Sequence, residues 1–547
     1  MDIFSIIYIV ACVICCIVTL RYDMQMFQLS SYRYDRYFRW WYPKNILTHR
    51  KWWPLVMLLG LPNWMINYAF IIDELAQIGS ITRVGMLLSK LNLFLTIIAI
   101  ILAVKSIKKE LTEKYKTPIV FTMRVKRMYA TALTLVALIM AAAAVINVAY
   151  VPLASMLTLL FSNFVVLAAN IINTPIEKSI TRWYYNDAKR IIESHKGLTI
   201  IGITGSFGKT STKNYLASVL SEKYNVLVTP GNFNTLLGVV RTIREQLRPY
   251  HQVFIVEMGA KQPNDIKEIC DLVHPQIGIL TAVGEMHLET FKSFENIQKT
   301  KFELIDSLPQ NGLAVLNYDS AGISSYKNIK SNCEILTYGV ENSAAMLKAK
   351  NIEYGASGVG FTYSDGNGEE QYTSRLLGSG NLLNILASIA VANRLQVPVS
   401  KQKASISRLQ PVEHRLSLRR ANGISVLDDA YNSNPTGAAM AIDVLKGFAV
   451  GSDNKRIIIT PGFVEMGARQ FEANKQLGRL IAQGCDYAIV VNETNRQAIK
   501  SGIEEGGMNE NKVYLAANLT DAHAHLATIL KAGDVVLYEN DLPDNFK

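Results

Sequence analysis

Long apolar runs alternate with basic connections in the first third of the chain, and shorter apolar runs alternate with helical patterns in the rest. Each long run approaches the ~20 residues that a membrane-spanning helix needs. The first run lacks a basic leader and an A-x-A cleavage site, which predicts a retained span and not a signal peptide. We expect a transmembrane domain of about five helices within 1–172. The predicted spans are 3–20, 53–72, 84–104, 130–150 and 153–172.

Charge asymmetry between the connections predicts an orientation. Lys and Arg gather in the connections 21–51 and 105–127, whereas 73–83 holds only Arg83. Because basic loops mark the cytoplasmic side, we expect a multi-pass membrane protein with its N-terminus outside and everything after the last span in the cytoplasm. Lys90 lies inside the third predicted span, so it either snorkels to the interface or marks a shorter, re-entrant helix.

Aromatic and basic side chains crowd the first connection, in SYRYDRYFRWWYPKN and again in KWW. Trp, Tyr and Arg are typical of segments at the level of lipid headgroups, so segment 31–53 predicts an interfacial belt. A site for a phosphorylated lipid is the second interpretation. Both interpretations make membrane lipid a partner of the protein.

The formal net charge of +11 belongs to this front region, because basic and acidic residues nearly balance from Gly197 onward. A nucleic-acid-binding protein would carry its excess positive charge on the soluble domain that binds. The distribution therefore argues against nucleic acid as a partner. The six cysteines follow neither metal-ligand nor disulfide spacing.

Beyond the last span, residues 173–196 predict an amphipathic linker, in which Ile176, Ile180, Tyr184 and Ile191 share one helical stripe. Strand-like runs such as LTIIGIT, VFIVEMG and IGILTAV then alternate with helical patterns, which predicts a parallel α/β sheet. A Gly-rich alternating stretch over 336–378 predicts a β insertion. A second, Rossmann-like α/β block starts near 411 with ISVLDDAYNSNP. The predicted domains are 1–172 (membrane), 173–196 (linker), 197–410 and 411–547.

The segment ITGSFGKTST, residues 203–212, joins a strand to a helix. A strand, a Gly-containing turn and Lys-Thr at the start of a helix aim backbone N–H groups and the helix N-terminus at phosphate. Lys209 would neutralise the β- and γ-phosphates of ATP, and Thr210 would bind Mg²⁺. The glycine spacing departs from the regular phosphate loop, because the first glycine stands one place early at Gly202. An ordinary strand-to-helix turn is therefore the alternative for this segment alone.

Seven motifs, in order along the chain, resemble the Mur ligase family. The DAYNSNP run and EMGA favour its MurF type, the ligases that add D-alanyl-D-alanine to UDP-N-acetylmuramoyl-tripeptide. The resemblance covers 197–547 and implies a Mur ligase central ATP-binding domain over 197–410 and a Mur ligase C-terminal domain over 411–547. The motifs are ITGSFGKTST (203–212), GNFNTLLGV (231–239), IVEMGA (255–260), GEMHLETFKSFENIQKTKFELID (284–306), GSGNLLN (378–384), EHR (413–415) and LDDAYNSNP (427–435).

The resemblance implies an ATP-dependent acid–amino-acid ligase of bacterial peptidoglycan synthesis. ATP phosphorylates a substrate carboxylate, and an amine displaces phosphate from the acyl phosphate; two crowded anions react in this way only when cations offset their charge. Thr210 and Glu257 match the positions that hold one Mg²⁺, and His287 matches a ligand of the second. Lys301 matches a lysine that is carbamylated in the family. The implied catalytic residues are Lys209, Glu257, His287 and Lys301, and the implied metal-binding residues are Thr210, Glu257, His287 and Lys301.

The resemblance also implies an ATP site shared between the two α/β domains. Asn381 and Asn384 match adenine-binding positions, Arg415 lies near the γ-phosphate, and Asp429 binds the ribose. Closure of the C-terminal domain would complete this site and exclude water. Gly380 departs from the histidine usual in the MurF type. The implied ATP-binding residues are Gly205, Ser206, Gly208, Lys209, Thr210, Ser211, Asn381, Asn384, Arg415 and Asp429.

Two departures bear on the substrate. Predicted spans stand where MurF-type ligases have a soluble N-terminal domain for the UDP-linked precursor, and the chain ends VVLYENDLPDNFK in place of a Lys-Gly-Ser-Arg run. Our leading hypothesis is a ligase that joins an amino acid or dipeptide to a lipid-linked carboxylate at the membrane. MurF activity on the soluble UDP-linked precursor is the alternative.

A hypothesis of another class is an ATP-gated transporter, in which the α/β half binds ATP only to move the spans. A transporter would carry polar or ionisable groups inside several spans. Only Lys90 fits that description in the predicted spans, so the sequence favours the ligase.

Overall fold

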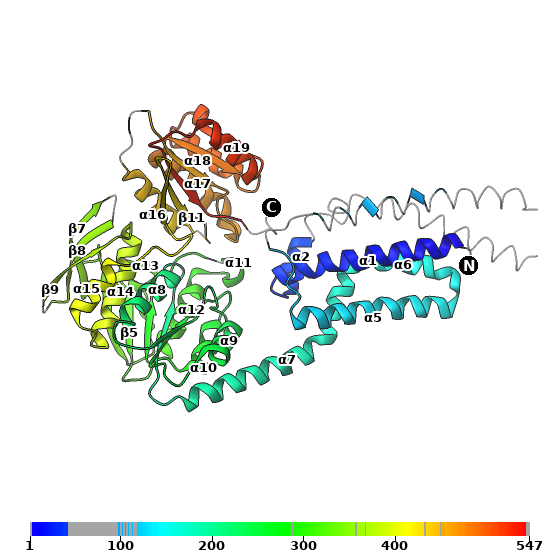
Figure 1. The fold of residues 1–547 in the computed structure, drawn as a ribbon, viewed down its shortest axis with the longest axis horizontal. Helices are drawn as coiled ribbons and strands as arrows, with labels where there is room; N and C mark the ends of the chain where they lie inside the picture. The colour runs from blue at the N-terminus through cyan, green and yellow to red at the C-terminus, as the bar shows by residue number, and fades with distance from the viewer. Residues whose placement is uncertain are drawn as a thin grey trace, which may run out of the picture. The chain divides into compact units, whose positions relative to one another are not determined.

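The structure is a computed structural model, drawn as a ribbon in Figure 1. Its described residues form two compact units, Met1–Thr181 and Arg182–Leu542. The second unit contains both α/β domains. The described residues are 3–41, isolated positions between 94 and 112, and 117–542 with gaps at 287, 356–357, 367, 432–433, 449–450 and 452.

The first unit is helical. α5 begins where the Thr122 side chain accepts a hydrogen bond from the backbone N–H of Val125, an N-cap that satisfies one free donor of the first turn. Apolar side chains from α1, α5, α6 and α7 form its buried core. The helices are α1 (Ile3–Leu29), α2 (Tyr34–Trp41), α5 (Met123–Ile146), the 3₁₀ turn η1 (Val148–Tyr150), α6 (Val151–Leu160) and α7 (Ser162–Ser194).

Three of the predicted spans correspond to helices of this unit: 3–20 lies in α1, 130–150 overlaps α5, and 153–172 falls on α6 and the start of α7. Among the described residues, α5 is the one helix long and apolar enough to cross a membrane. The α6–α7 pair, bent by 79° at its junction, would make a second if counted as one span. The predicted spans 53–72 and 84–104, Lys90 included, lie outside the described residues apart from isolated positions. The prediction of about five spans is therefore not confirmed.

The predicted linker 173–196 is not a separate helix. α7 runs without a break from the apolar segment into the amphipathic one, although Pro175 removes one backbone donor from its interior. Side chains just before the proline bond back to carbonyl groups one turn earlier, Asn173 to Ala169 at 2.8 Å and Thr174 to Asn170 at 2.7 Å. The contact boundary between the two units falls within α7, after Thr181.

The central domain is built on one nine-stranded sheet of order β2-β3-β1-β4-β5-β6-β7-β8-β9. The pairs from β2 to β7 along this order are parallel, and within the predicted β insertion at one edge the pairs β7–β8 and β8–β9 are antiparallel. The elements are β1 (Thr199–Thr204), α8 (Lys209–Leu220), β2 (Val226–Val228), α9 (Leu236–Gln246), β3 (Val253–Glu257), α10 (Asp265–Val273), β4 (Ile277–Leu280), α11 (Leu288–Phe291), α12 (Phe294–Asp306), β5 (Leu313–Asn317), α13 (Ala321–Ser324), β6 (Glu334–Gly339), β7 (Leu347–Gly355), β8 (Gly358–Ser364), β9 (Glu369–Ser374), α14 (Ser379–Arg394) and α15 (Val399–Ser407).

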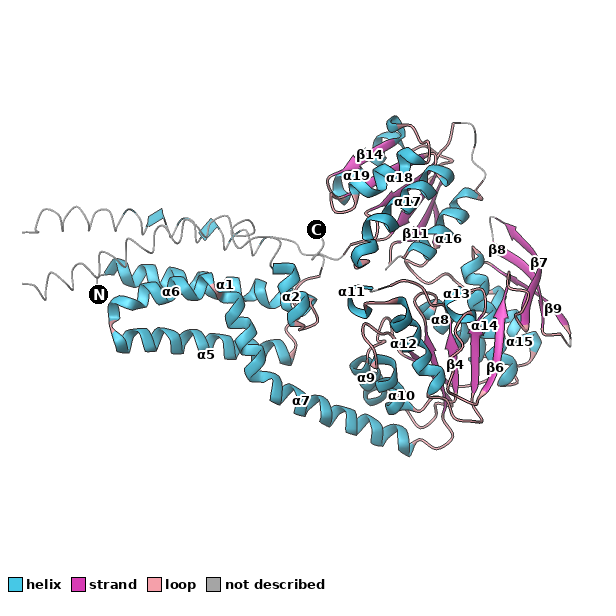
Figure 2. Ribbon diagram, turned by 180° about the vertical axis from the view of Figure 1, so that it is seen from behind, coloured by secondary structure: helices cyan, strands magenta, loops and turns pink. Residues whose placement is uncertain are grey.

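Helices cover both faces of this sheet (Figure 2). Successive side chains of a strand point to opposite faces, so Ile201 and Ile203 of β1 pack with α8 and α14, whereas Ile200 packs with α9, α10 and α12. β1 is therefore buried on both sides. Its carboxyl end, where the phosphate loop begins, is held by two hydrophobic layers.

The C-terminal domain has a second sheet of order β10-β11-β15-β12-β13-β14, in which only the β10–β11 pair is antiparallel. α16, α17 and α18 pack on one face and α19 on the other, as a Rossmann-like fold requires. The elements are β10 (Ser417–Ala421), β11 (Ile424–Asp429), α16 (Pro435–Lys446), β12 (Arg456–Thr460), η2 (Gly467–Arg469), α17 (Gln470–Gly484), β13 (Tyr487–Val491), α18 (Arg496–Glu505), η3 (Glu510–Lys512), β14 (Val513–Ala516), α19 (Leu519–Ile529) and β15 (Val535–Glu539).

Candidate active site

The phosphate loop leaves β1 at its carboxyl end and enters α8 at Lys209. Gly205 has φ 154° and Gly208 has φ 81°. A Cβ on Gly205 would lie 2.1 Å from Thr281 Oγ1, and one on Gly208 would lie 2.8 Å from Asn384 Oδ1. Only glycine satisfies both the backbone angle and the space. The loop is thus held tightly against β4 and α14, with the N-terminus of α8 at its end, which is the arrangement that binds phosphate.

The Lys209 ammonium folds back over this loop. Its Nζ donates to the carbonyl oxygens of Gly205 at 2.6 Å and Ser206 at 3.2 Å. Burial lowers the pKa of Lys209 to about 8, although the negative charge of Glu257 opposes this. Ser206 fixes the other side of the loop, because its hydroxyl bonds to the backbone of Gly284. A cation placed over a glycine loop at a helix N-terminus fits the phosphates of ATP.

Glu257 ends β3 and is 1% exposed. Its Oε1 accepts hydrogen bonds from Thr210 Oγ1 at 3.2 Å and Asn234 Nδ2 at 3.0 Å. Lys213 Nζ lies 3.0 Å from Oε2. Burial alone would raise the pKa of Glu257, but the charges of Lys213 and Lys209 hold it below its usual value. The carboxylate is therefore ionised beside the phosphate loop.

The residues present fit a Mg²⁺ ion, which prefers hard oxygen ligands. Thr210 Oγ1 and the Glu257 carboxylate supply such oxygens, and the fully buried Glu257 Oε2 has Lys213 Nζ as its ionic partner at 3.0 Å. His287 lies outside the described residues. Across the residues that are described, no group of three or more His, Cys, Asp and Glu side chains is gathered for a metal. The first ion site is consistent with the sequence, whereas the second stays a prediction.

Lys301 lies on α12 and is 4% exposed. Burial lowers the pKa of its amine to about 7, and the positive charge of Lys209 lowers it further. The predicted lysine is therefore brought near the phosphate loop, and its amine makes no hydrogen bond or ion pair with any described residue. Burial disfavours the charged form of a lysine without an ionic partner. The Lys301 amine therefore loses its proton more readily than an exposed lysine does.

Asn381 and Asn384 both lie in the first turns of α14, and both contact α8. Tyr215 OH donates to Asn381 Oδ1 at 2.9 Å, and Thr212 Oγ1 donates to Asn384 Oδ1 at 3.0 Å. Asn381 Nδ2 donates to Leu377 O at 2.9 Å. The described contacts thus give both side chains a role in joining α14 to the helix of the phosphate loop. Their predicted contact with adenine stays a prediction, as does the role of Ser211.

Arg415, in the connection before the C-terminal domain, is brought toward the site. Burial lowers the pKa of its guanidinium, while the charges of Asp429 and Glu257 raise it. The guanidinium carbon lies 4.5 Å from the centre of the Tyr431 ring. Asp429 Oδ1 accepts a hydrogen bond from the Leu416 backbone at 2.9 Å, and burial raises the pKa of Asp429 to about 6 against the opposing effect of Arg415.

Sequence reasoning missed the side chains that connect these parts. Lys213 stands one helical turn after Lys209 on α8 and donates to Gly231 O at 2.7 Å. Asn232 donates to Tyr431 OH at 2.8 Å, which links loop 230–235 to the C-terminal domain. The i, i+4 spacing of the two lysines and the two asparagines in GNFNT were visible signals. Their partners lie far away in the sequence, so the contacts themselves could not be predicted.

Replacing Lys213 by Met should destabilise the protein, because the Glu257 carboxylate would stay buried without its cation. We expect the free energy of unfolding of the α/β unit to fall by roughly 3 kcal/mol, measured by thermal or urea unfolding of the full chain. Mg²⁺ should restore part of the loss, since it replaces the missing positive charge. The double variant Lys213→Met/Glu257→Gln should be more stable than Lys213→Met; equal instability of the two would contradict the charge argument.

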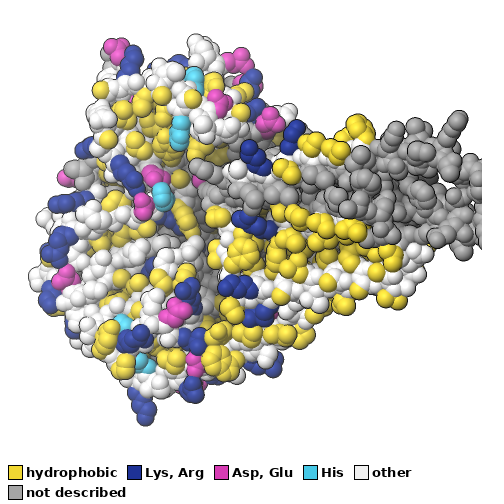
Figure 3. Space-filling model, turned by 45° about the vertical axis from the view of Figure 1, so that its right-hand side comes forward, with side chains coloured by type: hydrophobic (Ala, Val, Ile, Leu, Met, Phe, Trp, Pro, Cys, Tyr) yellow, Lys and Arg dark blue, Asp and Glu magenta, His cyan; other side chains and the backbone are white. Residues whose placement is uncertain are grey.

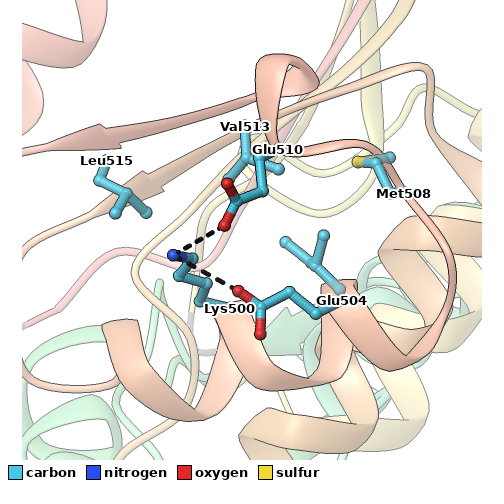
Figure 4. A pocket seen from close by; sticks show the side chains of 7 residues that line it. Lys500, Glu504, Met508, Glu510, Val513 and Leu515 are labelled. Atoms are coloured by element: carbon cyan, nitrogen blue, oxygen red, sulfur yellow. Dashed lines mark ion pairs between the residues drawn. The ribbon is translucent and has the colours of Figure 1, made fainter.

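A separate pocket of about 200 Å³ lies on the C-terminal domain (Figure 4). Lys500 Nζ lies at its centre, 3.4 Å from Glu504 and 3.1 Å from Glu510, so its charge is already balanced. None of the predicted site residues lines this pocket. The lining residues are Lys500, Ile503, Glu504, Met508, Glu510, Val513 and Leu515.

Comparison with known proteins agrees with this geometry. Residues 203–392 match the Mur ligase middle domain, and residues 414–538 match the Mur ligase glutamate ligase domain. The UDP-N-acetylmuramoyl-tripeptide–D-alanyl-D-alanine ligase of Escherichia coli is 26% identical over 356 residues, 64% of this chain and 78% of that protein. The ligase of the same name from Mycobacterium tuberculosis is 30% identical over 358 residues, 62% of this chain and 70% of its own length.

A solved structure is also similar. The MurF ligase of Thermotoga maritima in complex with ADP is 28% identical, with a TM-score of 0.58 over 66% of this chain and 80% of that one. The residues that the two family models match lie in the α/β unit and include the phosphate loop, Glu257 and Lys301. The chain belongs to the Mur ligase family of ATP-dependent ligases.

Proposed function

We propose that this protein joins an amine to a carboxylate of a peptidoglycan precursor at the cytoplasmic face of the bacterial cell membrane. One observation carries the ligase half of the proposal: Lys209, Glu257 and Arg415 interact electrostatically around the phosphate loop, although they come from α8, β3 and the connection before β10. Cations on both sides of an anionic reaction centre suit phosphoryl transfer.

The proposed reaction has two steps. A carboxylate oxygen of the precursor attacks the γ-phosphorus of ATP, which gives an acyl phosphate and ADP. The amine nitrogen then attacks the acyl carbon, an amide bond forms, and inorganic phosphate leaves while the amine releases a proton. Lys209 and Arg415 would offset the charge that builds up on the phosphate oxygens in the first step.

We propose further that two Mg²⁺ ions serve this site and that Lys301 carries a carbamate. Thr210 and Glu257 would hold the first ion, and His287 with the carbamate oxygens would hold the second. When bound, Mg²⁺ would supply positive charge that offsets the charge of the phosphate groups. In support, the Lys301 amine is buried near the positive charge of Lys209, where conversion to an anion removes a repulsion between two cations.

The membrane location is proposed from the apolar surface of the first unit. On α5, Val145 is 86% exposed and Ile146 is 75% exposed. Figure 3 shows apolar side chains gathered over this unit. A soluble protein rarely leaves so continuous an apolar surface open to water. A lipid-linked precursor would bring its carboxylate to the same membrane, and the soluble UDP-linked precursor is the alternative substrate.

The ligase proposal is tested by phosphate release from ATP in the presence and absence of an amine. We expect release only when D-alanyl-D-alanine and a muramoyl-tripeptide acceptor are both present, and we expect the amide product by mass spectrometry. Comparing the UDP-linked acceptor with the same tripeptide on a lipid diphosphate carrier identifies the substrate. ATP turnover without an amine, coupled to solute uptake, would favour the transporter instead.

The proposed topology, with the N-terminus outside and the ligase domains inside, has its own test. Protease added to right-side-out spheroplasts should spare a tag at the C-terminus and remove one at the N-terminus. Removal of the C-terminal tag would contradict the topology without affecting the ligase proposal.

A further inference from the structure

The first unit contains a partly buried arginine, Arg124, that pairs with no carboxylate among the residues that the structure describes. Arg124, near the start of α5, donates from Nη2 to Asn170 Oδ1 at 3.2 Å, and its guanidinium carbon lies 3.8 Å from the centre of the Tyr32 ring. Its Nε is buried and donates to no acceptor in the described part of the chain. The contacts of Arg124 with the described residues are therefore one neutral amide and one aromatic face. A charge removed from water without an opposite charge is unfavourable unless a ligand supplies one.

The described carboxylates of this unit are bound to other residues. Asp23 accepts a hydrogen bond from Ser162 Oγ at 2.7 Å, Asp35 pairs with Arg33 at 3.0 Å, and Glu177 pairs with Arg127 at 2.7 Å. None of these contacts is with Arg124. The described part of the unit thus contains unbalanced positive charge next to α5, in agreement with the basic side chains at one end of its apolar surface (Figure 3).

The position of Arg124 on its helix adds to the imbalance. α5 has no acidic residue in its first turn, where the helix dipole favours negative charge. Arg124, Lys126 and Arg127 stand there instead. An anion at this point would interact favourably with the guanidinium and with the helix N-terminus.

A further polar group, the Tyr34 hydroxyl, lies next to Asn170. Tyr34 OH accepts a hydrogen bond from Asn170 Nδ2 at 2.7 Å, which leaves the hydroxyl proton free to be donated. Trp41 contacts Phe164 edge to face, with ring centroids 5.7 Å apart. Since Tyr34 begins α2 and Trp41 ends it, α2 runs along α7 from Asn170 to Phe164 and places aromatic side chains beside the arginine.

From these observations we propose that Arg124, Tyr34 and Asn170 form a binding site for the phosphate group of a phosphorylated ligand. Arg124 Nε and Nη1 would donate hydrogen bonds to phosphate oxygens, and Tyr34 OH would donate a third. A lipid headgroup and a soluble phosphate ester share this chemistry, and the test below distinguishes the two sources. The site is separate from the phosphate loop, and it stands whether or not the ligase proposal is correct.

The test is calorimetric titration of the full chain in a non-ionic detergent, in a Lys209→Ala background that removes phosphate binding at the ATP site. The probes are dioctanoyl phosphatidic acid, dioctanoylglycerol as the same lipid without phosphate, and inorganic pyrophosphate. We expect phosphatidic acid or pyrophosphate to bind and dioctanoylglycerol to bind more weakly. Binding of phosphatidic acid identifies a lipid source, and binding of pyrophosphate alone identifies a soluble one.

Arg124→Gln should weaken binding by roughly tenfold or more. The matched control is Lys126→Gln, which removes the same charge from an exposed position of the same helix turn and should change binding less than about twofold. Arg124→Lys should keep part of the affinity, and Tyr34→Phe should lower it with the ring retained. Equal weakening by Arg124→Gln and Lys126→Gln would indicate a nonspecific basic belt and overturn the proposal.

Protein stability gives a second readout that does not depend on the choice of probe. Since Arg124 forms no ion pair with a described residue, Arg124→Gln should leave the unfolding temperature of the ligand-free protein nearly unchanged. If that variant fails to fold, Arg124→Lys and Tyr34→Phe still decide the question. If Tyr34→Phe and Arg124→Lys both bind the probes as tightly as the parent protein, neither side chain recognises phosphate specifically, and the proposal would also be overturned.

Discussion

Replacing Lys209 by Ala should abolish ATP-dependent phosphate release, with a loss of roughly 10³-fold or more. The ammonium lies over the phosphate loop with its charge offset only in part by Glu257, so the variant removes the cation that would draw the phosphates into place. The unfolding temperature should not fall, because the cost of burying the charge disappears with it. Phosphate release and thermal unfolding of the full chain, measured in parallel, check both expectations.

A surface lysine of the same domain is the matched control. Lys267 is half-exposed on α10 and pairs with Asp271 at 2.7 Å, a contact worth little in water. Lys267→Ala should therefore keep its activity. Normal phosphate release in Lys209→Ala would show that the loop does not bind the transferred phosphate.

The α/β architecture was predictable because its signal is local and periodic. Buried strands such as TIIGIT are short apolar runs, and each is followed by a helix with its own apolar stripe, so the parallel sheet follows from the order of the runs. The β insertion was equally visible as alternating residues between glycines. The end of a helix is a weaker signal. Apolar and amphipathic segments on either side of Ile172 are both helical, and α7 simply continues through them.

The site was predictable where one short segment defines it and unpredictable where the partners are distant. The phosphate loop, with Gly205 and Gly208 at positive φ, can be read from ITGSFGKTST. Lys213 is fully buried against Glu257, yet nothing in STKNYL distinguishes it from an exposed helix lysine. The energetic reason for its burial, a carboxylate on β3, becomes visible only when β3 lies beside β1.

The two asparagines of α14 have a structural role that the family resemblance did not predict. The motif GSGNLLN places Asn381 and Asn384 at positions the family uses for adenine. In the structure, their Oδ1 atoms accept hydrogen bonds from Tyr215 OH and Thr212 Oγ1, respectively. Those bonds hold α14 against α8, so the same side chains support the phosphate loop from behind. A substitution at either position would disturb the loop even if it never touched the nucleotide.

Lys301→Ala should lower the rate of amide formation by roughly 10²-fold or more, and a short carboxylate should restore part of it. If the neutral amine takes up CO₂ and loses a proton, it becomes a carbamate, an anion in place of an ammonium near the positive charge of Lys209. Burial favours this course, because it lowers the pKa of Lys301 to about 7 and so leaves much of the amine neutral at pH 7. Acetate or bicarbonate added to Lys301→Ala supplies the missing anion, and the rate of amide formation measures the rescue.

The choice of rescuing ion separates the two roles that a buried lysine can have. Lys301→Ala alone would not distinguish them, because loss of either an anion or a cation would lower the rate. Acetate should rescue and methylamine should not, whereas Lys299→Ala, at an exposed position of the same helix α12, should need no rescue. Better rescue by methylamine would mean that Lys301 acts as a cation, and the carbamate would then be wrong. Removing CO₂ from the wild-type assay gives an independent check, since the activity should fall and return when bicarbonate is added.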